Sequence, residues 1–108
     1  MKRFVETYNA IEGYHRWKDA PKECEYLASR HRHIFVIRCR YEVKHNDREI
    51  EINLQQTKIE KLLRGRFGHP CEFGNSSCED IAELIIEQTN AQEVTVLEDN
   101  YGGATLSR

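Results

Sequence analysis

The segment from His31 to Lys44 alternates between two kinds of side chain, and this alternation constrains the fold more than any other part of the chain. Side chains on a β-strand point to opposite faces with a period of two, so every second residue shares one face. One face carries two imidazoles followed by apolar residues: His31, His33, Phe35, Ile37, Cys39, Tyr41 and Val43. The pattern predicts a long strand with one buried face and two histidines at its beginning.

Shorter patterns of the same kind predict the other strands. We expect strands over residues 4–15, 93–98 and 104–106, and a brief alternating stretch over residues 49–54. The intervening residues 16–30 contain a proline and predict a loop or a short helical turn.

Two segments change to helical periodicity. Apolar residues at helical spacing predict a helix over residues 55–64, bracketed at its end by Gly65 and Gly68. A second helix begins near Ser76, which has the spacing of a capping box with Glu79. Its core-facing residues would be Cys78, Ile81, Ala82 and Ile85. The order strand, strand, helix, helix, strand, strand predicts an α+β fold: a four-stranded, antiparallel sheet with two helices on one face.

Composition narrows the function classes. The 108 residues suffice for one domain, residues 1–108, and the formal charge of -2 offers no general attraction to nucleic acid or to an anionic membrane. No apolar run is long enough for a membrane span, and the first residues lack the apolar core of a signal peptide, so we expect a cytoplasmic protein. The four cysteines form no CxxC pair and are expected to be free thiols.

Three of the five histidines converge in the predicted sheet. His15 ends the first long strand and His31 begins the second, so antiparallel pairing brings both, with His33, to the same end of the sheet. Neutral imidazoles are good zinc ligands, and a catalytic zinc site takes three protein ligands and leaves a fourth position open. A His-x-His pair alone is commonly an ordinary surface or core pair. His69 lies in a Gly-His-Pro loop, where it is either an exposed residue or an acid/base group.

One family shows a similar arrangement of motifs. Its pattern has His-Arg and an aromatic residue or leucine at a strand end, then a cysteine, then His-x-His at the start of the next strand. The matching residues here are His15-Arg16-Trp17, Cys24 and His31-Arg32-His33. Residues 48–54, 76–79 and 94–98 resemble that family's short strand, the start of its second helix and its penultimate strand. The chain thus resembles the 6-pyruvoyltetrahydropterin synthase family, which includes the bacterial 6-carboxytetrahydropterin synthases.

The resemblance implies the tunnelling fold, in which small subunits assemble into a barrel, as trimers or hexamers with active sites at subunit interfaces. It implies a zinc ion held by His15, His31 and His33. It also implies that Glu98 anchors a pterin, because the two oxygens of a carboxylate can meet two adjacent N–H donors. Glu79 is a second candidate for substrate contact, although we favour a capping role for it.

The implied activity is that of a zinc-dependent lyase acting on dihydroneopterin triphosphate, in pterin or 7-deazaguanine (queuosine-type) biosynthesis. Cys24 is the candidate for the proton-transferring thiolate and His69 for its histidine partner. Gly68 stands before His69, where the family has an aspartate. The connection over residues 64–75 is also shorter than the corresponding connection in the family. The catalytic Asp-His segment is therefore divergent.

Two alternatives remain open. The first is a catalytically altered relative that binds a pterin or purine with zinc and does not turn over the usual substrate. The second is a metal-free nucleic-acid adaptor. We do not expect nucleic acid to be the partner. Absence of zinc together with steeply salt-dependent binding to RNA or DNA would support the adaptor. The basic residues that would serve it are Arg30, Arg32, Arg38, Arg40, Lys44, Arg64 and Arg66.

Overall fold

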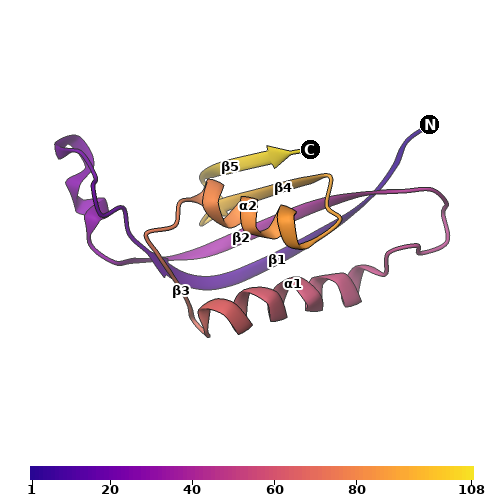
Figure 1. Ribbon diagram of the computed structural model, residues 1–108, viewed down its shortest axis with the longest axis horizontal. Helices are drawn as coiled ribbons and strands as arrows, with labels where there is room; N and C mark the ends of the chain where they lie inside the picture. Colours follow the sequence, from indigo (N-terminus) through magenta and orange to yellow (C-terminus); the bar gives the residue numbers. More distant parts are fainter.

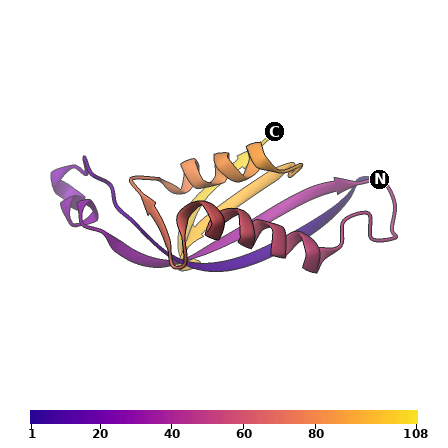
Figure 2. The same cartoon turned by 60° about the horizontal axis from the view of Figure 1, so that its bottom comes forward.

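Both helices cover the same face of one sheet (Figure 1), and Figure 2 shows this two-layer arrangement from a second direction. The computed structural model describes all 108 residues. Its elements are β1 (Arg3–His15), the 3-10 segment η1 (Lys22–Ala28), β2 (His31–Val43), α1 (Ile52–Phe67), β3 (Cys71–Gly74), α2 (Cys78–Gln88), β4 (Glu93–Glu98) and β5 (Gly102–Ser107). No helix is both long enough and apolar enough to cross a membrane.

The sheet has five strands in the order β3-β1-β2-β4-β5. The prediction of an α+β fold with two helices on one face is confirmed, but the prediction of a four-stranded antiparallel sheet is wrong. The additional strand is β3, which pairs in parallel with the end of β1, while the other pairs are antiparallel. A four-residue strand is too short to show periodicity, so it could not be predicted from the local pattern.

The core lies between the helices and the face of β2 that the alternation singled out. Phe35, Ile37 and Cys39 are fully buried there. They belong to one apolar cluster with Ile59 of α1 and Ile85 of α2. This burial fixes the strand register, because a slip by one residue would turn the apolar face outward.

The start of α1 differs from the prediction. The alternating stretch 49–54 forms no strand; instead α1 begins at Ile52, where the Glu51 side chain accepts a hydrogen bond from the Asn53 amide. Ile52 and Leu54 are exposed, so their alternation does not reflect a buried strand face. At the other end, α1 runs through Gly65 and stops at Gly68, whose φ of 88° suits a residue without a Cβ.

The start of α2 is displaced by one residue from the prediction. The capping box is formed by Ser77 and Asp80, not by Ser76 and Glu79. Both pairs have the same spacing, so the sequence alone could not separate them. The predicted core-facing residues of α2 are buried as expected: Cys78, Ile81, Ala82 and Ile85.

Candidate metal centre and adjoining pocket

The pairing of β1 with β2 brings three histidines together at one end of the sheet. His15 lies opposite His31, and Gly13 lies opposite His33. One ring nitrogen from each of the three histidines lies within 4.8 Å of the others, and His15 is 7% exposed. Three imidazoles at this separation form a group that could hold a metal ion.

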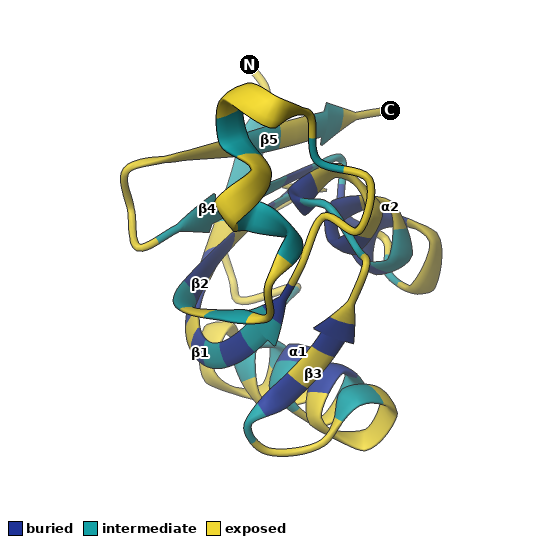
Figure 3. Cartoon of the chain, turned by 90° about the vertical axis from the view of Figure 1, so that its left-hand side faces the viewer, coloured by how far each residue is buried: buried dark blue, intermediate teal, exposed yellow.

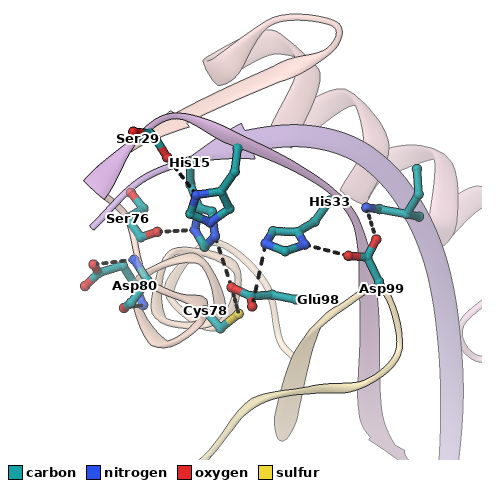
Figure 4. A network of polar contacts seen from close by, with 11 residues as sticks. His15, Ser29, His33, Ser76, Cys78, Asp80, Glu98 and Asp99 are labelled. Atoms are coloured by element: carbon teal, nitrogen blue, oxygen red, sulfur yellow. Dashed lines mark hydrogen bonds and ion pairs between the residues drawn. The ribbon is translucent and has the colours of Figure 1, made fainter. Parts of the chain in front are cut away.

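Each of the three rings is held by an acceptor at Nδ1. His15 donates from Nδ1 to the Ser76 carbonyl (2.9 Å), and His31 donates to the Ser29 carbonyl (2.8 Å). His33 donates to the Asp99 carboxylate at 2.6 Å (Figure 4). A carbonyl oxygen can only accept, so the proton of the neutral ring sits on Nδ1 and the lone pair is on Nε2. Outer acceptors of this kind orient metal-binding histidines and raise their basicity.

The Nε2 atoms of His15 and His33 are buried without a hydrogen-bond partner. Both face the Glu98 carboxylate, at 3.0 Å from His15 and 3.7 Å from His33 (Figure 4). Burial lowers the pKa of His15, which favours the neutral ring with its lone pair on Nε2. Lone pairs that face a carboxylate repel it unless a cation or a proton lies between them. The donor set therefore fits a divalent metal ion.

A buried thiol adjoins the same carboxylate. The Cys78 Sγ donates to Glu98 Oε2 at 3.7 Å. Burial, together with the negative charge of Glu98, raises the pKa of Cys78 to about 12. Cys78 is therefore a thiol at neutral pH and acts as a hydrogen-bond donor to Glu98.

A pocket of about 400 Å³ opens beside the histidines. Its wall includes His15 and His31, Glu79 and Glu98, Trp17 and Leu27. Glu79 is exposed and forms no ion pair, and the capping task expected of it is performed by Asp80. The pocket thus places two carboxylates and an indole next to a candidate metal centre.

The two residues expected to transfer protons lie elsewhere in the subunit. Cys24 lies in η1, part of an excursion between β1 and β2 that has no buried residue (Figure 3). His69 is exposed in the turn between α1 and β3. Neither residue lines the pocket. The chain brings together the three histidines, Glu98 and Glu79, but not Cys24 or His69.

Three of the residues that shape the site were not foreseen from the sequence. Ser29 and Ser76 contribute only backbone carbonyls, for which side-chain identity gives no signal. Asp99 occupies a tight turn after β4, in which Asp99 and Asn100 both have positive φ angles. Asp and Asn tolerate this conformation, so the pair Asp-Asn was a usable turn signal, but its contact with His33 depends on the tertiary fold.

The proposed basic surface is largely neutralised by carboxylates. Ion pairs join Arg30 to Glu72, Arg32 to Glu12, Arg40 to Glu6 and Glu93, and Arg64 to Glu60. These contacts support the ordinary interpretation of the alternating charges as a solvated outer face.

Comparison with known proteins supports the fold assignment. No protein-family model and no curated protein sequence matches this chain. The structure is similar to that of 6-pyruvoyl tetrahydropterin synthase from Caenorhabditis elegans, with a TM-score of 0.70 and 14% sequence identity. The similarity covers 100% of this chain and 96% of that enzyme's chain. The chain therefore has the fold of that synthase, as its sequence motifs predicted.

Proposed function

We propose that this protein is a zinc-dependent lyase of the 6-carboxytetrahydropterin synthase type, acting on dihydroneopterin triphosphate in pterin or 7-deazaguanine biosynthesis. One observation carries the proposal: three imidazoles, each with an acceptor at Nδ1, have ring nitrogens within 4.8 Å of one another beside a pocket with two carboxylates. The shared fold with a tetrahydropterin synthase supports the same conclusion.

His15, His31 and His33 would hold the zinc ion, next to the pocket that His15 and His31 line. A bound zinc ion would act as a Lewis acid toward the substrate's side-chain oxygens, which favours loss of a proton from the neighbouring carbon. Outer contacts from Ser76, Ser29 and Asp99 keep the three rings oriented for this task.

The carboxylates are suited to bind the ring system of the substrate. Glu98 accepts a hydrogen bond from Cys78 and lies beside the Nε2 atoms of His15 and His33. Glu79 forms no ion pair, so its two oxygens are available to accept a pair of ring N–H groups. We therefore assign ring recognition to Glu79 as well as to Glu98.

Cys24 and His69 remain the proposed proton-transfer residues, and they would act between subunits. β5 is an edge strand with no partner on its outer side, which supports pairing with a second copy in a trimer or hexamer. Mixing the inactive variants His31→Ala and His69→Ala tests this arrangement. Recovered activity in the mixture would support shared sites, whereas two variants that stay inactive in every mixture would place each site within one subunit.

The proposed reaction is tested by incubating the zinc-loaded protein with dihydroneopterin triphosphate and measuring released triphosphate. We expect one zinc ion per chain and triphosphate release that is lost in His31→Ala. Zinc-free protein after purification in metal-containing buffer would refute the metal centre. Stoichiometric zinc with tight pterin binding but no turnover would instead support the binding protein, which the replacement of the family's aspartate by Gly68 favours.

A further inference from the structure

The indole of Trp17 is exposed at the wall of the pocket although the backbone around it is firmly held. Trp17 lies two residues after the end of β1, and 49% of its surface is exposed. It lines the same pocket as His15, Glu79 and Glu98. Large aromatic side chains normally contribute their area to a core or to an interface, so a half-exposed indole in a pocket needs another explanation.

Three consecutive amides fix the backbone at this position. Arg16 donates to the Gly74 carbonyl at 2.8 Å, and Trp17 donates to the Leu27 carbonyl at 2.8 Å. Lys18 donates to the Asn75 side chain at 2.8 Å. These hydrogen bonds connect the backbone around Trp17 to the loop before α2 and to the excursion that carries η1. The backbone at Trp17 is therefore held before any ligand binds, which lowers the entropic cost of using its side chain as a contact surface.

We infer that Trp17 is the stacking surface for a planar heteroaromatic ring in this pocket, with Leu27 completing the apolar part of the wall. The inference rests on the proposed function and deepens it. The carboxylates of Glu79 and Glu98 accept N–H groups at the edge of such a ring, but they do not bind its face. An indole supplies the face contact that the carboxylates lack.

The test compares the affinity of the zinc-loaded full chain for neopterin in four proteins by isothermal titration calorimetry. The proteins are the wild type, Trp17→Ala, Trp17→Phe and Tyr26→Ala. Tyr26 is the matched control because it lies on the same excursion and is 73% exposed but does not line the pocket. Tripolyphosphate, which has no ring, serves as a second ligand.

We expect Trp17→Ala to weaken neopterin binding by about 5- to 150-fold, the range that loss of one ring-stacking contact produces. Trp17→Phe and Tyr26→Ala should stay within about threefold of the wild type, since phenylalanine still offers a flat ring. Tripolyphosphate binding should be the same in all four proteins, because it has no face to stack.

The outcomes separate this inference from the proposed function. If the wild type binds neopterin and Trp17→Ala binds it equally well, the stacking role is overturned and the proposed function stands. If Trp17→Ala changes the assembly state and leaves neopterin affinity unchanged, the indole is a subunit contact and the inference is again overturned. If zinc-loaded wild type binds no neopterin, both are overturned. If Trp17→Ala does not fold, the neopterin affinities of Trp17→Phe and the non-aromatic Trp17→Leu are compared instead. Weaker binding by Trp17→Leu than by Trp17→Phe supports the stacking role, and equal binding overturns it.

Discussion

The contact between Asp99 and His33 offers the sharpest test of the candidate metal centre. Asp99 accepts a hydrogen bond from His33 Nδ1 at 2.6 Å, and its other oxygen accepts from the Ile34 amide at 2.8 Å. The carboxylate is therefore fixed by a strand amide and in turn fixes the imidazole. The hydrogen bond from His33 and the bond from the Ile34 amide lower the pKa of Asp99, so it is ionised at neutral pH.

Two substitutions separate the charge of Asp99 from its hydrogen bond. Asp99→Asn keeps an acceptor oxygen and tolerates the positive φ of 51° at this position, whereas Asp99→Ala removes the acceptor. Loss of an outer partner of a metal-bound histidine costs about 10- to 100-fold in metal affinity. We expect Asp99→Asn near the lower end of this range and Asp99→Ala near the upper end, which corresponds to about 1.4 to 2.8 kcal/mol.

The assay is competition for zinc against a chromophoric chelator at neutral pH, with circular dichroism to verify folding. Asn100→Asp is the matched control, since it changes the charge in the same turn at a residue whose side chain forms no hydrogen bond with the three histidines. Its zinc affinity should remain within about twofold of the wild type. A folded Asp99→Ala variant with wild-type zinc affinity would refute the claim that Asp99 prepares His33 for metal binding.

Three further predictions concern a close backbone contact, a buried phenol and the one thiol that is not buried. Gly103→Ala should lower the free energy of unfolding, measured by urea titration, by about 1–3 kcal/mol or more, because a Cβ there would lie 1.8 Å from the Val96 carbonyl oxygen. Gly102→Ala is the control: a Cβ at Gly102 has no atom within 4 Å, so the free energy of unfolding should stay within about 0.5 kcal/mol of the wild type. Burial raises the pKa of Tyr41 to about 12, so the folded state binds the phenolic proton more tightly than the unfolded chain. Stability should therefore be complete below about pH 10 and decline between about pH 10 and 12, and Tyr41→Phe should reduce this decline in urea titrations across that range; an unchanged decline would contradict the assignment. Cys24 is the one cysteine that is not buried, so a thiol-specific chromogenic reagent should label one site rapidly in the native protein, and a fast phase that persists in Cys24→Ser would contradict this.

The sequence predicted the long strands and the core face of α2 because each feature is periodic over many residues. The alternation through β2 corresponds to alternating burial, apart from Ile34 and Val36, and the pairing of His15 with His31 followed from the short excursion between antiparallel strands. Features that depend on a single position were harder to predict from the sequence. The capping box moved by one residue because Ser76 and Ser77 have acidic residues at the same spacing.

The candidate site divides in the same way. The histidines follow from strand alternation and pairing, so a reader of the sequence can place them. The parallel strand β3 cannot be inferred locally, because its partner Gly13 lies far away in the chain and pairing between them reflects the packing of Phe73 over Gly13. A Cβ at Gly13 would lie 2.7 Å from the Phe73 ring, so this close approach is available only to glycine.

The acceptors that orient the three imidazoles come from three separate connections. Ser29 precedes β2, Ser76 precedes α2, and Asp99 follows β4. These connections meet at one end of the sheet only because β1, β2 and β4 are neighbours and because β3 carries the chain back beside β1. The same three histidines without those connections would have mobile rings and undefined tautomers, and would bind a metal ion more weakly. Metal affinity at the candidate centre would therefore depend on the assembled fold, and a change that loosens one of the three connections should weaken the proposed metal binding without altering a ligand.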